Sequence, residues 1–209
     1  MPNDISATVF RAGMSRLAGA VAIVATGSAS GRAGWNGMTV TAMCSFCAEP
    51  PSLAVCLNRD TGTYTRLRCT GVFSVNVLAS HQVELARTFA GQRGLVGADR
   101  FAAGAWVARS PAVPVLADAL ASFECRVLKA VEHGTHGLLI GGIETVRWSD
   151  DDAEPLVYHR QRFRGLGRDI ESADDVAAGR AAAHGDPAVP DPAGEETNPT
   201  GGAPHDRSG

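Results

Sequence analysis

The sequence predicts a mainly β domain, an antiparallel barrel or sandwich that carries a few short helices. Short apolar and β-branched runs recur along the chain and are separated by turns rich in Gly, Pro and Ser. Only three short segments have helical spacing, and strands do not alternate with helices as they do in a doubly wound sheet. With 44% apolar residues among 209, the chain can bury one core.

The N-terminal part begins with a helix and continues as strands. Phe10, Met14 and Leu17 fall on one face of a helix over residues 9–18. Pro50 and Pro51 lie between the second and third predicted strands and separate them, because proline has no N–H to donate to a β-ladder. Three strands are predicted here, at residues 20–27, 34–46 and 52–57.

The remaining elements follow from capping residues and apolar runs. Thr61 is placed to cap a helix that ends near Cys69, and Ser80 to cap another that ends at Gly91. Residues 92–114 are predicted as a loop because they are rich in Gly and Pro. Further strands are predicted at residues 73–78, 122–131, 136–148 and 155–159.

Charge divides the chain into two parts. Residues 1–168 hold 17 Lys and Arg against 13 Asp and Glu, whereas residues 169–209 hold 2 against 9. The second part has no aromatic residue and is rich in Pro, Gly and Ala, so it is predicted to be a disordered acidic tail. An acidic arm that docks a partner is the alternative. Residues 1–168 are predicted to form the folded domain.

The same features bound the partners and the location. A net charge of +4 on residues 1–168 suits anionic small molecules, but the domain has a single Lys and no basic stripe, so no nucleic-acid partner is expected. The N-terminus lacks the basic and apolar regions of a signal peptide, and no run approaches membrane-spanning length. A cytoplasmic protein without a membrane partner is therefore expected.

Cys44 and Cys47 form a C-x-x-C that could be a metal clamp or a redox couple. In one continuous strand the two residues differ in parity, so they point to opposite sides unless a bulge intervenes. No second C-x-x-C or close His pair completes a zinc site. The sequence thus predicts no metal site, no disulfide framework and mostly buried thiols.

Hydroxyl side chains mark one face of the predicted strand over residues 34–46. Thr39, Thr41 and Ser45 are the odd positions, and the even positions are apolar. Beside Gly37, such hydroxyls can donate to a phosphate or to the polar edge of a heteroaromatic ring. A half-exposed strand with a Thr/Ser face is the alternative.

The order of several motifs resembles one known family. These motifs are FRxxMxxxAxxVAIVAT at 10–26, GMTVTAMCSFCAEPPSLAVCLNRDTGT at 37–63, FSVNVL at 73–78, ELARTFAG at 84–91, RF at 100–101, PVLADALASFECRV at 114–127, HGTHGLLIGGIETV at 133–146 and PLVYHRQRFR at 155–164. Together they resemble the short-chain flavin reductases of two-component flavin-dependent monooxygenases.

The resemblance implies a fold and an activity. The fold would be the FMN-binding split β-barrel, assembled as a homodimer. The enzyme would bind FMN or FAD, take a hydride from NADH or NADPH, and supply reduced flavin to a separate flavin-dependent monooxygenase or halogenase. No GxGxxG opens a helix after a strand, so a Rossmann-type cofactor site is not expected.

Carried over by position, the resemblance also implies a set of cofactor-binding residues. They are Thr39, Thr41, Ala42, Met43, Cys44 and Ser45 along the flavin ring and ribityl chain, Asn58, Arg59 and Thr61 at its phosphate, and Thr88, Phe89 and Ala90 as a second wall. From the residues alone, Arg59 could instead be a solvated turn arginine, and Phe89 could be helix core.

Two further segments resemble the family's nicotinamide site. One is Gly134-Thr135-His136, in which Thr135 replaces the family's common Asp; the other contains Tyr158, His159 and Arg160. His136 is the one catalytic candidate, although an isolated histidine at a strand start is more often an edge residue. Arg160 could equally belong to a solvated strand end.

Hydride transfer between two rings needs no side-chain nucleophile, which agrees with a sequence that shows no catalytic triad. Three rival functions stay open. The protein could bind flavin without catalysis, it could be a related FMN-barrel oxidase, or it could use the cysteines as a thiol redox or metal protein.

Overall fold

The computed structural model describes residues 5–28, 31–109, 113–149 and 152–167, and the predicted acidic tail lies outside them. The helical elements are α1 (Ala7–Met14), η1 (Gly31–Gly34), α2 (Gly62–Thr70), η2 (Ser80–Gln82), α3 (Val83–Phe89) and η3 (Gly97–Ala102). The strands are β1 (Gly19–Ala20), β2 (Ala22–Thr26), β3 (Asn36–Val40), β4 (Met43–Cys47), β5 (Ser52–Asn58), β6 (Val72–Val77), β7 (Trp106–Arg109), β8 (Val113–Leu116), β9 (Ala121–His133), β10 (His136–Trp148), β11 (Val157–His159) and β12 (Arg162–Arg164).

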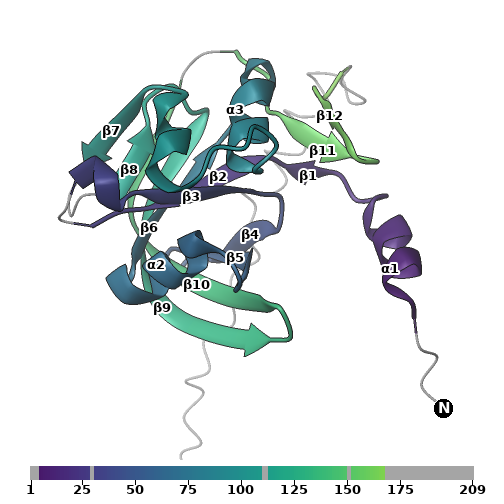
Figure 1. Ribbon diagram of the computed structural model, residues 1–209, viewed down its shortest axis with the longest axis horizontal. Helices are drawn as coiled ribbons and strands as arrows, with labels where there is room; N and C mark the ends of the chain where they lie inside the picture. Colours follow the sequence, from purple (N-terminus) through teal and green to yellow (C-terminus); the bar gives the residue numbers. More distant parts are fainter. Residues whose placement is uncertain (1–4, 29–30, 110–112, 150–151, 168–209) are drawn as a thin grey trace, which may run out of the picture. The chain divides into compact units, whose positions relative to one another are not determined.

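Seven antiparallel strands form one curved sheet in the order β3-β2-β6-β9-β10-β5-β4 (Figure 1). Its two edge strands, β3 and β4, are consecutive in the sequence, and the chain passes between them at Thr41 and Ala42. The sheet therefore curls like a barrel that stays open along the line between β3 and β4. This is the predicted split barrel.

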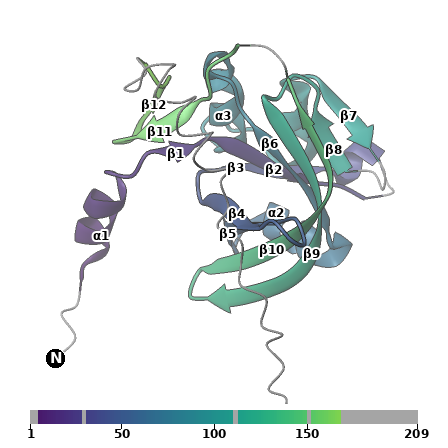
Figure 2. The ribbon, with the colours of Figure 1, turned by 180° about the vertical axis from the view of Figure 1, so that it is seen from behind.

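Two smaller sheets extend this arrangement. β7 pairs with β8, and β11 pairs with both β1 and β12. The view from behind shows the long β9–β10 hairpin. It places α1 beyond the N-terminal end of β1, apart from the seven-stranded sheet (Figure 2). Correspondingly, α1 has no buried residue.

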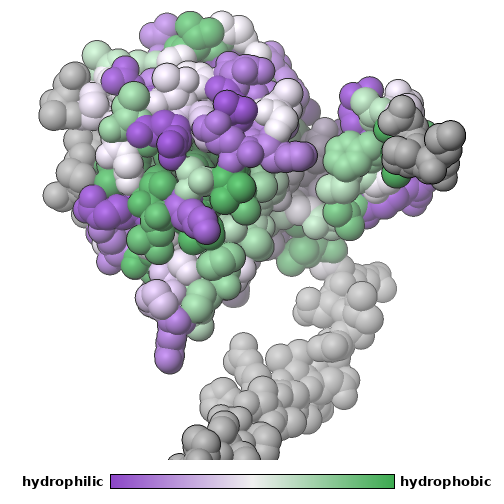
Figure 3. Space-filling view, turned by 90° about the horizontal axis from the view of Figure 1, so that it is seen from below, coloured by the Kyte–Doolittle hydropathy of each residue, from purple (hydrophilic) through white to green (hydrophobic). Residues whose placement is uncertain are grey.

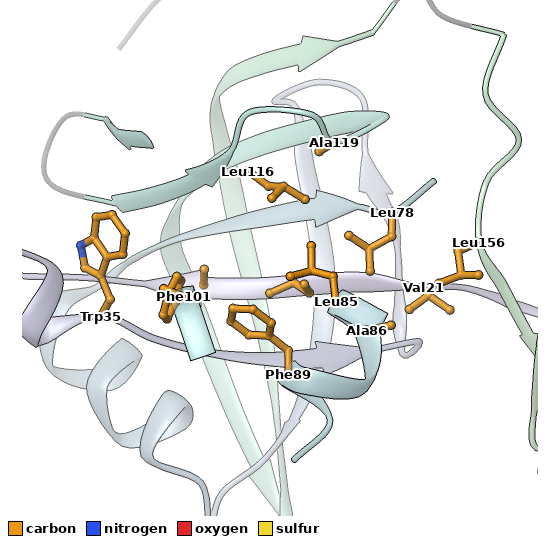
Figure 4. Close-up of a cluster of buried hydrophobic side chains, with 12 residues drawn as sticks. Val21, Trp35, Leu78, Leu85, Ala86, Phe89, Phe101, Leu116, Ala119 and Leu156 are labelled. Atoms are coloured by element: carbon orange, nitrogen blue, oxygen red, sulfur yellow. The ribbon is translucent and has the colours of Figure 1, made fainter. Parts of the chain in front are cut away.

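The core lies on both faces of β2. Val24 belongs to the cluster inside the curved sheet with Phe73 and Leu139, whereas Ile23 belongs to a second cluster under α3 and η3. This second cluster, drawn in Figure 4, includes the edge-on ring pair Phe89 and Phe101, with centroids 5.0 Å apart. Burial on both faces explains why residues 20–27 are almost continuously apolar.

Glycines in β10 let large side chains of the inner cluster approach the sheet. A Cβ on Gly137 would lie 2.5 Å from the Tyr64 ring, and one on Gly141 would lie 2.5 Å from the Phe73 ring. Both rings are buried, so neither can move aside. The glycines of the HGLLIGG run therefore serve packing between α2, β6 and β10.

The structure confirms most predicted strands and corrects several details. Residues 34–46 form two strands rather than one, and residues 92–114 contain η3 and β7 rather than a loop alone. Ser80 is not the cap of its helix; the side chain of Gln82 instead accepts a hydrogen bond from the Ala79 N–H at 2.9 Å. Thr61 caps α2 as predicted, accepting from the Tyr64 N–H.

Candidate functional site

A cavity of about 760 Å³ lies where the chain crosses from β3 to β4. Its floor is the outward face of β4, β5 and β10. Opposed residues in an antiparallel ladder share a face, and the register places Cys44 opposite Ala54 and Leu138 opposite Cys56. The Cys56 N–H donates to the Ala42 carbonyl at 2.9 Å, so Ala42 lies beside Cys56.

The side chains on this floor are small. Ala42, Cys44, Ala54 and Cys56 all line the cavity, and only Leu138 adds a longer side chain. Such a surface offers an apolar contact to a planar ring without blocking it. The geometry therefore suits an aromatic ligand that lies along the strands.

The crossing itself supplies polar groups. Thr41 and Ala42 belong to no strand, and the Thr41 hydroxyl makes no hydrogen bond to another residue in the described part of the chain. Gly19 allows β1 to pass close by, since a Cβ there would lie 3.2 Å from the Thr41 Cβ. A donor with no partner at the rim of an apolar floor can bind the polar edge of a ring.

The walls come from distant parts of the chain. Met14 and Leu17 belong to the N-terminal segment, and Tyr158 belongs to β11, where its ring lies 5.2 Å from that of Phe163. The charged residues that line the cavity are Arg11 and Arg160. Sequence reasoning missed Arg11, Met14, Leu17, Cys56 and Leu138 as site residues, because their pattern signals only helix or strand packing.

The predicted phosphate-side residues lie elsewhere. Arg59 forms an ion pair with Glu132 at 2.7 Å and donates to the Gly134 carbonyl at 3.0 Å. It lines a second cavity of about 500 Å³, together with Arg68 and Thr135. Asn58 accepts from the Asp60 N–H at 2.9 Å, and the Thr61 hydroxyl donates to the Asn58 carbonyl at 2.7 Å. These hydrogen bonds stabilise the turn after β5 and the start of α2.

Tyr64 joins the second cavity to the core. Its hydroxyl donates to Glu132 at 2.8 Å, and its ring is buried. Burial, and then the hydrogen bond to the Glu132 carboxylate, raise the pKa of Tyr64 above its ordinary value near 10.0. Because the folded pKa lies above the unfolded one, the stabilisation from neutral Tyr64 is complete below pH 10 and disappears as the pH rises through the folded pKa.

Replacing Glu132 by Gln is expected to lower the pKa of Tyr64 toward its ordinary value, because the negative acceptor is lost while burial stays. Tyrosinate absorbance in a Tyr158→Phe background isolates Tyr64, since the chain has two tyrosines. An unchanged titration in Glu132→Gln would show that burial alone raises the pKa. Glu144→Gln, which removes an exposed carboxylate paired with Arg126, is the matched control.

Two of the three residues of the predicted second wall, Thr88 and Phe89, are packed into the protein. Phe89 is 1% exposed, the Thr88 hydroxyl donates to the Glu84 carbonyl at 2.9 Å, and Ala90 follows α3 at the surface. On β3, the Thr39 hydroxyl donates to the Ala86 carbonyl at 2.7 Å. The hydroxyls of Thr39 and Thr41 therefore do not share one ligand-facing surface, because the strand ends between them.

The remaining predicted residues divide between the cavity and its surroundings. Met43, Tyr158 and Arg160 line the cavity, whereas Ser45 and His159 are not among its lining residues. His136 is exposed at the start of β10, and its Nδ1 lies 2.9 Å from the Thr135 hydroxyl. The Thr135 hydroxyl is thus the hydrogen-bond partner of this imidazole nitrogen.

The structure places the Cys44 and Cys47 side chains differently from the prediction. A bulge between Ser45 and Cys47 places Cys47 opposite Ser52, so Cys44 and Cys47 share a face, contrary to the parity expected of one regular strand. Even so, all five cysteines are free, and the described residues hold no group of three or more potential metal ligands. The expectation of mostly buried thiols is wrong: only Cys125 is buried, which raises the pKa of its thiol to about 12.

No helix among the described residues is both long and apolar enough to cross a membrane.

Comparisons with known proteins give one consistent result. Residues 14–167 match the family model described as flavin reductase like domain. A protein of Agrobacterium fabrum named FMN reductase (NADH) RutF is 41% identical over 157 residues, which cover 75% of this chain and 87% of that protein.

Two solved structures have a similar fold. The flavin reductase component BorF of a bacterial two-component tryptophan halogenase has a TM-score of 0.70 and 29% identity, covering 78% of this chain and 100% of BorF. The NADH:FAD oxidoreductase SgcE6 of Streptomyces globisporus, in complex with NAD and FAD fragments, has a TM-score of 0.70 and 26% identity, covering 82% and 98%.

Proposed function

Because the chain belongs to the flavin reductase like domain family, we propose that it is an NADH-dependent flavin reductase. The observation that carries this proposal is the cavity at the barrel opening, with its floor of small side chains beside Thr41, whose hydroxyl has no hydrogen-bond partner among the described residues. A flavin ring is planar, apolar on its faces and polar along one edge, so the residues present fit it.

When bound, the flavin supplies the chemistry, since its N5 accepts a hydride from C4 of the nicotinamide. The chain has to hold the two rings in contact and exclude water. Ala42, Cys44 and Ala54 would form the floor for one ring, and Tyr158 lines the same cavity. The Thr41 hydroxyl would donate to the polar edge of that ring. No side chain has to act as a nucleophile.

His136 and Arg59 are secondary candidates in this proposal. His136 lies outside the cavity lining, and its Nδ1 is engaged with Thr135, so its role would be to contact the nicotinamide amide through Nε2. Arg59 reaches a phosphate only if its ion pair with Glu132 opens. Both proposals require small movements on ligand binding.

The test is a spectrophotometric assay of the purified protein. NADH and NADPH are each offered with FMN, FAD or no flavin, and the loss of reduced nicotinamide is followed. We expect rapid NADH consumption only with added flavin. A non-catalytic flavin-binding protein would leave NADH unchanged, and an oxidase would carry a tightly held flavin and oxidise its own substrate without added flavin.

We also propose that the enzyme acts as a homodimer. On α1, Phe10 is 59% exposed, and on the sheet Phe46 and Leu128 are 57% and 59% exposed, and none of the three lines the cavity. Figure 3, viewed from the side of the β9–β10 hairpin, shows hydrophobic residues at the surface among hydrophilic ones. Exposed apolar groups of this size favour a protein interface. Sedimentation analysis of the wild type and Phe10→Asp tests this, with a shift to monomer expected for the variant.

The reduced flavin is proposed to pass to a separate flavin-dependent monooxygenase or halogenase. The similarity to the reductase component of a two-component halogenase supports this. Dependence on a reduced nicotinamide dinucleotide supports the proposed cytoplasmic location. Residues 1–168 are proposed to form the whole catalytic domain, with residues 169–209 as an appended acidic segment.

A further inference from the structure

We propose that His133 and His136 together bind a divalent transition-metal ion, of the kind of Zn²⁺ or Ni²⁺, at the tip of the β9–β10 hairpin (Figure 1). Binding of the ion does not depend on the proposed function. Its effect on turnover does rest on that function, because His136 is a candidate contact of the nicotinamide.

The hairpin brings the two imidazoles together. His133 is the last residue of β9, His136 is the first residue of β10, and the register places them directly opposite each other. Opposed residues of an antiparallel pair share a face, with Cβ atoms about 4.5–5.5 Å apart. Two imidazoles at this spacing can reach one ion, since a Zn–N bond is about 2.0–2.1 Å long. The three-residue spacing in the sequence gives no such signal, because in a continuous strand the two residues would lie on opposite faces.

A hydrogen bond prepares His136 for this role. Its Nδ1 lies 2.9 Å from the Thr135 hydroxyl. Histidines that bind a metal commonly donate their other ring N–H to an oxygen nearby, which fixes the tautomer and the orientation of the ring. When the Nδ1–H donates to the Thr135 hydroxyl, the lone pair is on Nε2, where an ion can bind it.

Arg59 holds the turn between the two histidines. Its N–H donates to the Thr135 carbonyl at 2.9 Å, and its guanidinium donates to the Gly134 carbonyl at 3.0 Å. The positive charge of Arg59 is balanced by the Glu132 carboxylate at 2.7 Å, so it opposes a bound cation only weakly. A turn that is already fixed lowers the entropy that binding has to remove.

Water completes the coordination shell. Both histidines are exposed, so an ion can reach them and keep several water ligands. On the other side of His136, Asn58 lies opposite it on β5, and the Asn58 Oδ1 already accepts from the Asp60 N–H. The site thus offers two imidazole nitrogens, and imidazole is a ligand that suits Zn²⁺ and Ni²⁺.

The bound ion would lie next to the floor of the large cavity. Alternate residues of a strand face the same side of the sheet, so His136 and Leu138 share a face, and Leu138 lines that cavity. An ion on Nε2 of His136 also removes the nitrogen proposed to contact the nicotinamide amide. We therefore expect the ion to inhibit NADH oxidation.

The first experiment is calorimetric titration of the full chain with nickel chloride and with zinc chloride. His133→Ala and His136→Ala should each weaken binding at least about tenfold, because the second imidazole binds at a high effective concentration once the first is engaged. His81→Ala, which removes an exposed histidine at a different cavity, is the matched control and should leave the affinity unchanged. Cys44→Ser should also leave it unchanged, which separates the histidines from the thiol on the cavity floor.

The second experiment measures NADH turnover with added flavin. Zinc chloride should inhibit the wild type, and a chelator should restore the rate. His133→Ala should keep the metal-free rate, because His133 has no proposed role in turnover, and it should lose the sensitivity to zinc.

Three results would overturn the metal site. They are an affinity that depends on only one of the two histidines, losses no larger than that of His81→Ala, and a loss in Cys44→Ser equal to the losses in the hairpin variants. Zinc inhibition that persists in His133→Ala would overturn its effect on turnover. A failure of the proposed function is distinct, since the wild type would then not consume NADH with any flavin while the titrations still decide whether the two histidines share an ion.

Discussion

Replacing Cys44 by Trp is expected to abolish flavin-dependent NADH oxidation while the protein stays folded. Cys44 is exposed, and its side chain lies on the cavity floor opposite Ala54. An indole at this position occupies the space over the strands where a flavin ring is proposed to lie. The affinity for FMN should fall at least about 100-fold, which corresponds to roughly 2.7 kcal/mol.

The measurements are flavin binding by fluorescence quenching and NADH turnover with saturating flavin. Substitution of an exposed residue usually changes stability by no more than about 0.5 kcal/mol, so the midpoint of unfolding should be close to wild type. Cys44→Ser keeps the size and should keep most activity. Cys47→Ala, outside the cavity lining, should leave turnover nearly intact. Unchanged flavin affinity in Cys44→Trp would mean that the ring does not lie on this floor.

Replacing Asn76 by Ala is expected to lower the stability of the protein strongly, and this is the second large effect. Asn76 is fully buried in β6. Its Oδ1 accepts from the Leu116 N–H at 2.9 Å and from the Ser122 hydroxyl at 3.2 Å, and its Nδ2 donates to the Ile23 carbonyl at 3.1 Å and to the Ser74 hydroxyl at 2.9 Å. One amide thus joins β2, β6, β8 and β9.

Without this amide, the buried Leu116 N–H has no partner, and the two serine hydroxyls each lose one. An unsatisfied buried donor costs about 1–3 kcal/mol. We therefore expect the free energy of unfolding to fall by about 3 kcal/mol and the melting temperature by roughly 10 °C. Denaturant and thermal unfolding, both followed by circular dichroism, measure the change.

Asn58→Ala is the matched control for this substitution. Asn58 is only half-buried, and the one hydrogen bond that its side chain accepts comes from the Asp60 N–H in the same turn. Its loss should lower the free energy of unfolding by less than about 1 kcal/mol. Equal effects of the two substitutions would contradict the stabilising role of the Asn76 network.

Local patterns in the sequence determined many of the elements. The apolar run of β2, the Thr61 cap of α2 and the alternation in β6 depend on neighbours within a few residues, so they can be read directly. The short strands β1 and β12 escaped prediction because two or three residues carry too little pattern. The bulge in β4 also escaped, because nothing local to it signals the extra residue.

The family itself could also be identified from the sequence, because the order of motifs over residues 10–164 is specific although no single motif is. The match of residues 14–167 to the flavin reductase like domain confirms it. That identification does not fix which side chains face one cavity. Thr39 and Thr41 look equivalent in the sequence, yet one hydroxyl bonds α3 and the other lies at the cavity.

The sequence by itself thus determined the β-rich class, the strands and the family, since these depend on short-range periodicity and on motif order. Only the tertiary structure decided that Arg11, Cys44, Cys56 and Arg160 meet around one cavity while Arg59 pairs with Glu132. The physical reason is the crossing at Thr41 and Ala42. There the chain leaves one edge of the curled sheet for the other, so contacts depend on how distant strands close rather than on spacing along the chain.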